Sequence, residues 1–193
     1  MRVISGTARG TKLHALDVPQ LRPMLDRVKE SLFNIIRDRL DGVPVLDLFS
    51  GSGALGIEAL SRGAASCLFV EQDPKLVGLL RRNVEKCHMT DRCRVLEADF
   101  FALPGQCPPA GALPADVVFA DPPYAVVDDP NRRAELFGVL EGMAGEWIRA
   151  GALVMLHHEP LPHALWPTQR LECFDQRVYG RSQITLFELR GDA

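Results

Sequence analysis

The sequence predicts an α/β fold in which helices cover both faces of a mostly parallel sheet. Between residues 43 and 157, short apolar segments alternate with helical segments, which is the order typical of doubly wound sheets. Glycine-rich or acidic motifs follow four of the apolar segments, as expected at the carboxyl ends of parallel strands, where ligands bind. Two further apolar segments, 171–178 and 183–189, flank Tyr179-Gly180-Arg181 and predict a terminal antiparallel pair.

Hydrophobic periodicity and turn residues predict the elements in order. Residues 1–22 should form short strands broken at Gly6 and Gly10, as an appendage to the sheet. Residues 25–40 should form a helix, because their apolar side chains fall close to one stripe. The expected strands of the alternating region are 43–49, 66–71, 93–98, 116–120 and 151–157. The expected helices are 53–62, 74–87 and 132–148, with loops at 104–115 and from Asp121 to about Asn131.

Length and composition indicate a soluble globular protein. A chain of 193 residues fits a single domain with a sizeable core. No apolar run approaches the roughly 20 residues of a membrane span, and the first residues lack a signal-peptide hydrophobic region. The five cysteines form no CxxC pair, so we expect neither a zinc site nor a disulfide framework. A reducing compartment, most simply the cytoplasm, follows from this cysteine usage.

Charge is distributed unevenly along the chain. Residues 1–29 carry six basic and two acidic residues, although the whole chain has a net charge of -3. A basic segment on an acidic body favours localised contact with phosphates, although a solvated surface would show the same charge. The basic residues expected to bind phosphates are Arg2, Arg9, Lys12 and Arg22. We therefore divide the single domain into an arm, residues 1–24, and a core, residues 25–193.

A glycine-rich turn follows the strand that contains Asp47. Gly51, Gly53 and Gly56 match the GxGxxG pattern, which lets the backbone turn tightly and approach a ligand at a helix N-terminus. Glu71 ends the next strand, twenty residues after Gly51, where an acid can bind both hydroxyls of a ribose. A third strand ends in an acid as well, at Asp99. Three such strand ends in this order predict a nucleotide-like ligand.

The fourth strand end carries Asp121-Pro122-Pro123-Tyr124. The Asp121 carboxylate can accept a hydrogen bond from an exocyclic amine, and the Tyr124 ring offers a stacking face. The two prolines fix the backbone between these groups. An ordinary proline-rich turn has the same composition, but it does not explain why this tetrapeptide follows three other ligand-type strand ends.

A dinucleotide-dependent oxidoreductase is the alternative that the glycine-rich turn and Glu71 leave open. No downstream motif suggests a nicotinamide half-site, and Asp99 suits the amine of an adenine. The terminal antiparallel pair is unusual for that class but normal for S-adenosylmethionine enzymes. These observations favour a methyltransferase.

The chain resembles class I methyltransferases and, within them, the RsmD family of bacterial 16S rRNA guanine-N2 methyltransferases. The resemblance runs nearly end to end. It is carried by "RVISGTARGTKL", "LRPMLDRVKESLFNII", "VLDLFSGSGALGIEALSRGA", "FVEQD", "DPPY" and "YGRSQITLFEL". It implies a Rossmann-like, mostly parallel seven-stranded sheet with a C-terminal antiparallel pair and a short basic N-terminal appendage. The implied partner is 16S rRNA in the small ribosomal subunit or its assembly intermediate. The resemblance implies no metal cofactor in the protein.

The resemblance also implies roles for individual residues. The turn at Gly51 and Gly53 would hold the methionine part of S-adenosylmethionine, and Asp47 would orient its amino group. Glu71 would bind the ribose, while Asp99 and Phe100 would contact the adenine amine and ring. Asp121 and the Pro122 carbonyl would receive the guanine amine, and Tyr124 would stack on the base.

Two positions receive other interpretations. The family usually has Thr where this chain has Met24, which we interpret as a packing residue. His157 and His158 are interpreted as polar ends of a core strand, because the methylated amine becomes acidic and needs no dedicated base. Two other functions stay open: an amino methyltransferase acting on DNA adenine or protein glutamine, and a non-catalytic ribosome-assembly factor.

Overall fold

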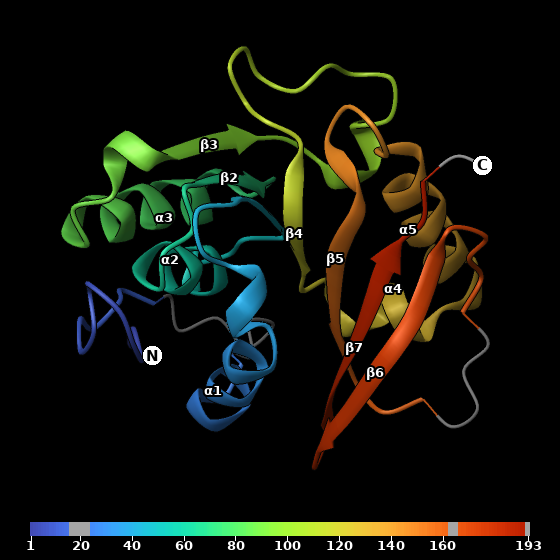
Figure 1. The fold of residues 1–193 in the computed structure, drawn as a ribbon, viewed down its shortest axis with the longest axis horizontal. Helices are drawn as coiled ribbons and strands as arrows, with labels where there is room; N and C mark the ends of the chain where they lie inside the picture. The colour runs from blue at the N-terminus through green and yellow to red at the C-terminus, as the bar shows by residue number, and fades with distance from the viewer. Residues whose placement is uncertain (16–23, 162–165, 192–193) are drawn as a thin grey trace.

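The computed structural model describes residues 1–15, 24–161 and 166–191, and their strands form a seven-stranded sheet (Figure 1). The strand order is β3-β2-β1-β4-β5-β7-β6. Strands β1 to β5 run parallel, whereas β7 is antiparallel to both β5 and β6. The strands are β1 Pro44–Leu48, β2 Ser66–Glu71, β3 Cys93–Glu97, β4 Ala115–Ala120, β5 Ile148–His158, β6 Leu171–Tyr179 and β7 Ser182–Leu189. The predicted parallel sheet with a terminal antiparallel pair is therefore confirmed.

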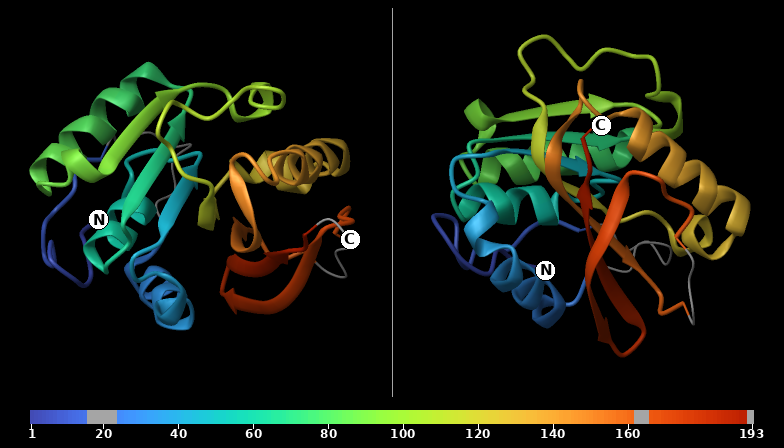
Figure 2. Two further views of the ribbon diagram at one scale, coloured as in Figure 1. Left: turned by 45° about the horizontal axis from the view of Figure 1, so that its top comes forward. Right: turned by 45° about the vertical axis from the view of Figure 1, so that its right-hand side comes forward.

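Helices cover both faces of the sheet, because alternate residues of each strand point to opposite sides. In β4, Val117 and Phe119 pack with α1, α2 and α3, whereas Val118 and Ala120 pack with α4 and α5. Figure 2 shows these helices on the two sides of the strands. The helices are α1 Asp26–Ile35, α2 Ala54–Ser61, α3 Pro74–Lys86, α4 Tyr124–Asp128 and α5 Pro130–Gly142. Short 3₁₀ turns are η1 Arg37–Arg39, η2 Thr90–Arg92 and η3 Phe100–Ala102.

The structure corrects three predicted boundaries. Residues 1–15 form no regular strand, only an isolated antiparallel bridge between Arg2 and Lys12. The helix predicted over 132–148 ends at Gly142, because Gly145 has φ +92° and its N–H turns to the Ile148 carbonyl. The predicted loop after Asp121 contains the short helix α4. In the first two cases a glycine or tertiary packing overrode the local apolar pattern.

The N-terminal segment, residues 1–15, packs against the core. Val3 and Leu13 are buried in the same apolar cluster as α1 and α2. The Arg2 side chain forms an ion pair with Asp26 at 3.2 Å, and Lys12 is exposed. The segment therefore presents its basic side chains to solvent while its apolar ones fix it in place.

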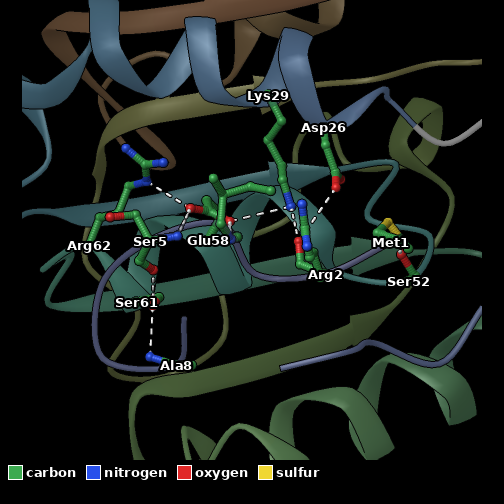
Figure 3. Close-up of polar contacts among 12 residues, drawn as sticks. Met1, Arg2, Ser5, Ala8, Asp26, Lys29, Ser52, Glu58, Ser61 and Arg62 are labelled. Carbon is green, nitrogen blue, oxygen red and sulfur yellow. Dashed lines mark hydrogen bonds and ion pairs between the residues drawn. The ribbon is translucent and has the colours of Figure 1, made fainter. Parts of the chain in front are cut away.

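A buried carboxylate on α2 holds the same segment (Figure 3). Glu58 accepts the backbone N–H groups of Ile4 and Ser5 at 2.7 and 3.0 Å. It also pairs with Lys29 of α1 at 3.3 Å and with Arg62 at 2.7 Å. Burial lowers the pKa of Lys29, and the neighbouring Glu58 opposes that effect. Since every one of these groups is paired, the cluster ties the N-terminal segment, α1 and α2 together.

Candidate functional site

A cavity of about 870 Å³ opens at the carboxyl ends of β1, β2 and β4, a volume within the range of small-molecule sites. Residues from four strand ends line it, the ends of β1, β2, β3 and β4, although they are up to 77 residues apart in the sequence. Its lining includes Gly51, Glu71, Phe100, Asp121, Pro122 and Tyr124. The structure thus brings together residues that the sequence assigned to a cofactor and to a target amine.

The glycine-rich turn after β1 needs two of its glycines for different reasons. Gly51 has φ +55°, a left-handed conformation that side chains rarely adopt, and its backbone N–H donates to Glu71 Oε2 at 2.8 Å. Gly53 has φ +80°, and a Cβ there would lie 2.2 Å from Cδ1 of Leu80 on α3. Gly51 therefore shapes the cavity wall, whereas Gly53 lets α3 pack against the turn.

Asp47 lies in β1 beneath this turn and is 1% exposed. Its Oδ2 accepts the N–H of Gly56 at 2.8 Å, at the start of α2. Burial raises the pKa of Asp47 well above its ordinary value, the Gly56 hydrogen bond opposes this shift, and the charges of Asp121 and Glu71 add to it. A cationic amino group bound in the cavity would offset the cost of ionising this carboxylate.

Glu71 is also engaged by backbone. Its Oε2 accepts the N–H of Gly51 and its Oε1 accepts the N–H of Asp73, at 2.8 and 2.9 Å. A carboxylate oxygen has two lone pairs, so each oxygen retains one acceptor position. Glu71 can therefore brace the turn and still receive a ribose hydroxyl from the cavity.

The third strand end places its two predicted residues differently. Phe100 is 2% exposed, lines the cavity and packs on Phe49 with ring centroids 4.9 Å apart. Asp99 is exposed, and its Oδ1 accepts the N–H of Phe101 at 3.0 Å. Phe100 thus forms an apolar wall suited to an adenine ring, and Asp99 lies in the loop next to that wall.

Asp121, Pro122 and Tyr124 follow β4 on the other side of the cavity. The Asp121 side chain is 29% exposed, Pro122 is buried, and Tyr124 is the first residue of α4. Pro123 takes an extended φ and ψ of -51° and 137°, which turns the chain sharply into that helix. An acceptor oxygen and an aromatic ring therefore both line the cavity, three residues apart in the chain.

The sequence interpretation missed His157. This residue is 1% exposed, and its Nδ1 lies 2.7 Å from Asp121 Oδ1. The signal that could have found it is its position: His157 is the penultimate residue of β5, and Leu156 before it pairs with Ala120, the residue before Asp121. His158, in contrast, bonds the Glu159 carbonyl and Thr185, and burial lowers its pKa to about 4. The interpretation as a polar strand end fits His158.

Comparison with known proteins agrees with this arrangement. The sequence profile of the family described as "Conserved hypothetical protein 95" matches residues 1–188. Ribosomal RNA small subunit methyltransferase D of Escherichia coli K12 is 34% identical over 187 residues, which cover 93% of this chain and 87% of that protein. The chain belongs to the RsmD family.

Further relatives extend the comparison. The putative rRNA methyltransferase YlbH of Bacillus subtilis is 46% identical over 99 residues, about half of each chain (51% and 54%). The solved structure of the putative methyltransferase yhhF from Escherichia coli superposes with a TM-score of 0.83 at 30% identity, covering 100% of this chain and 99% of that one. Fold and family make the chain a class I methyltransferase, whose methyl donor is S-adenosylmethionine.

The cavity fits that cofactor on the evidence of its own residues. The lining includes a backbone turn with left-handed Gly51, a carboxylate with free acceptor positions at Glu71, and an apolar wall at Phe100, which follow the neighbouring strands β1, β2 and β3. They match a methionine moiety, a ribose and an adenine in chemistry. Met24 is 9% exposed within the apolar cluster of α1 and also lines the cavity, which agrees with a packing role.

The described basic residues of the arm, Arg2, Arg9 and Lys12, are not part of the cavity lining. Arg2, Arg9 and Lys12 are exposed, and Arg22 falls outside the described residues. The cavity lining nevertheless includes Met1 and Ala15 from the same segment. The N-terminal segment is therefore both part of the cavity wall and a carrier of exposed positive charge.

Over residues 1–15, 24–161 and 166–191, no group of three or more His, Cys, Asp or Glu side chains is arranged to hold a metal ion. Within the same ranges, no helix has the length and apolar character needed to cross a membrane. All five cysteines are free thiols.

Proposed function

We propose that this methyltransferase transfers a methyl group from S-adenosylmethionine to the exocyclic N2 amine of a guanine in small-subunit rRNA. The observation that carries the proposal is Asp121 beside Tyr124, at the edge of the cavity that Gly51 and Glu71 line on the opposite side. The printed names of the RsmD relatives support an rRNA substrate. The N2 position rests on the family resemblance and on the fit of the Asp121 carboxylate to an amine.

Two ends of the cavity divide the work. The cofactor end comprises Asp47, Gly51, Glu71 and Phe100 of the cavity lining, with Gly53 in the same turn and Asp99 in the adjacent loop. The target end comprises Asp121, Pro122 and Tyr124. When bound, S-adenosylmethionine would supply a methyl group on a cationic sulfur. The bond between that sulfur and the methyl carbon breaks on transfer, and the sulfur becomes a neutral thioether. What remains for the chain is to bind, orient and desolvate the reactants.

The target end acts on a poor nucleophile, because the lone pair of a guanine amine is delocalised into the ring. Hydrogen bonds from the amine to an Asp121 oxygen and to the Pro122 carbonyl favour a more tetrahedral nitrogen with a directed lone pair. Stacking on Tyr124 holds the base in plane. The new bond joins N2 to the methyl carbon, and N2 then loses a proton, because it is cationic and acidic. A base in a helix exposes no such face, so the guanine must be splayed out.

The substrate form and the cellular location belong to the same proposal. The arm, residues 1–24, would bind rRNA phosphates through its exposed Arg2, Arg9 and Lys12, together with Arg22. The partner would be the small ribosomal subunit or its assembly intermediate, in the cytoplasm. The core, residues 25–193, would hold the cofactor and the target base.

Methylation in vitro tests the proposal. The protein is incubated with S-adenosylmethionine labelled in its methyl group and with small subunits, naked 16S rRNA, duplex DNA or total protein. The products are digested, separated by chromatography and identified by mass spectrometry. The proposal predicts label in N2-methylguanosine from small-subunit rRNA. Label in N6-methyladenine of DNA or in glutamine would instead identify another amino methyltransferase, and cofactor binding without any transfer would identify a non-catalytic assembly factor.

A further inference from the structure

His157 is joined to the target end by the register of two parallel strands. Ala120 of β4 pairs with Leu156 of β5, so Asp121 and His157 are the next residues along both strands. Paired residues of neighbouring strands point to the same face, and here their side chains meet with Nδ1 2.7 Å from Oδ1. The pairing of β4 with β5 therefore brings the two side chains together, with Asp121 directly after the end of β4.

The environment of the ring settles which atom donates. A proton must lie between Nδ1 and Oδ1 at this distance, because two bare lone pairs would repel each other. Nε2 of His157 is buried and has no hydrogen-bond partner among the described residues. Since a carboxylate oxygen can only accept, the arrangement that fits is an Nδ1–H that donates to Asp121.

The same ring also contacts the second group of the target end. The rings of His157 and Tyr124 lie edge to face, with centroids 5.9 Å apart and an interplanar angle of 70°. The Asp121 side chain is 29% exposed although one of its oxygens is engaged by His157, so its other oxygen remains for a ligand. His157 is too buried to reach a target base itself, at 1% exposure. Any effect it has on methyl transfer must pass through Asp121 and Tyr124.

We propose that His157 is a positioning residue for methyl transfer: it fixes the Asp121 carboxylate and the Tyr124 ring so that one Asp121 oxygen faces the target amine. The inference rests on the proposed function. It adds a residue that the glycine-rich and Asp-Pro-Pro-Tyr motifs do not contain.

His158 offers a matched control one residue away. It is also buried, at 0% exposure, but its side chain lies on the same face of the sheet as Leu156, opposite to the face of His157. Both of its ring nitrogens have partners, the Glu159 carbonyl and Thr185 Oγ1. A substitution at His158 therefore removes a buried imidazole from the same strand without touching Asp121.

The experiment compares His157→Leu, His157→Asn and His158→Asn. Asn can place an N–H donor where Nδ1 stands, whereas Leu fills the space without a donor. Single-turnover rates on the small-subunit substrate, the KM for that substrate, cofactor affinity by calorimetry and the melting temperature are measured for each. We expect His157→Leu to lower the rate constant about 10- to 100-fold, the scale of a misplaced catalytic group, with unchanged cofactor affinity. His157→Asn should recover most of that loss, and His158→Asn should change the melting temperature rather than the rate constant.

Each outcome has a defined meaning. A His157→Leu variant with the wild-type rate, an Asn variant no better than Leu, or an equal rate loss in His158→Asn would overturn the inference and leave the proposed function standing. A wild-type protein that binds S-adenosylmethionine but methylates no guanine would overturn the proposed function instead. The hydrogen bond has a readout without turnover: a downfield imidazole N–H proton resonance, present in the wild type and lost in Asp121→Ala.

Discussion

The acids at the cofactor end of the cavity differ from Asp121 at the target end in what holds them. Asp47 and Glu71 are 1% and 8% exposed, and both accept backbone N–H groups of the glycine-rich turn or the helix after it. Asp121 is more exposed, and the hydrogen bond it receives comes from a side chain, His157. Backbone N–H groups thus hold the acids at the cofactor end, whereas a side chain holds the acid at the target end. Substitutions at the two ends should separate cofactor binding from catalysis.

The largest expected effect is at Asp121. Asp121→Ala should lower the rate of methyl transfer about 100-fold or more, the scale of one lost transition-state contact, with cofactor affinity nearly unchanged. Rapid-quench kinetics and calorimetry measure the two quantities. Asp116→Ala, at the other end of β4 and paired with Arg149, is the control that should keep its rate. A near-normal rate in Asp121→Ala would make Asp121 a structural residue.

Glu71→Ala should affect binding and folding together. Loss of a charged hydrogen-bonding group should weaken S-adenosylmethionine binding by about 1.5–3 kcal/mol. The same change leaves the N–H groups of Gly51 and Asp73 without their acceptor, so the free energy of unfolding should fall by about 1–3 kcal/mol. Calorimetry and chemical denaturation measure the pair. If Glu71→Ala lost S-adenosylmethionine binding but kept the wild-type free energy of unfolding, Glu71 would contribute only a ligand contact and would not stabilise the fold.

Tyr124 sharpens the description of the target end. Tyr124→Ala should weaken productive RNA engagement by about 1–3 kcal/mol, the range for one stacked base, seen as a higher KM for the RNA. Tyr124→Phe retains the ring and should stay close to the wild type. Equal losses in both variants would assign the effect to the hydroxyl group and contradict stacking.

Asp47 gives a pH test of the cofactor end. Because burial raises the pKa of Asp47 in the folded state, ionising it costs stability as the pH rises from about 4, its unfolded value, towards the raised value. Asn cannot ionise but can still accept the Gly56 N–H. Asp47→Asn should therefore match or exceed wild-type stability at pH 7, by about 1–2 kcal/mol, and lose that advantage below about pH 4.

Denaturation at a series of pH values measures this difference. Cofactor affinity should fall in the same variant, since the carboxylate is the proposed partner of a cationic amino group. An Asp47→Asn protein that is less stable than the wild type at every pH would show that the carboxylate is accommodated at no cost.

The smallest effect is expected from the arm. Replacing Arg9 and Lys12 by Ala should flatten the salt dependence of RNA binding by up to about two contacts, each worth about 0.7–0.9 log units per tenfold change in salt. Cofactor affinity should stay the same, because both side chains are exposed. The matched control is Arg149→Ala with Arg190→Ala, which removes the same charge from side chains paired with Asp116 and Glu172. Loss of cofactor affinity with an unchanged salt slope would assign the arm to the cavity instead.

Local patterns predicted most of the fold and the motifs of both ends, but not the features that depend on register or on distant partners. The glycines, Glu71 and Asp121 could be predicted because each belongs to a short motif that directly follows an apolar strand segment. The His157 contact depends on the pairing of β4 with β5, which no pattern within either strand encodes. The same holds for Lys29, which reads as a surface lysine of an amphipathic helix and is buried against Glu58.

The central claim is that Asp121 directs a methyl group onto the N2 amine of a guanine in small-subunit rRNA. The most direct measurement is the ribonucleoside composition of that rRNA, by mass mapping, in cells that lack this gene and carry either the wild-type or the Asp121→Ala form. The account predicts one N2-methylguanosine that the wild type restores and the variant, at equal abundance, does not. Restoration by the variant, or a methyl group found on another atom, would contradict it.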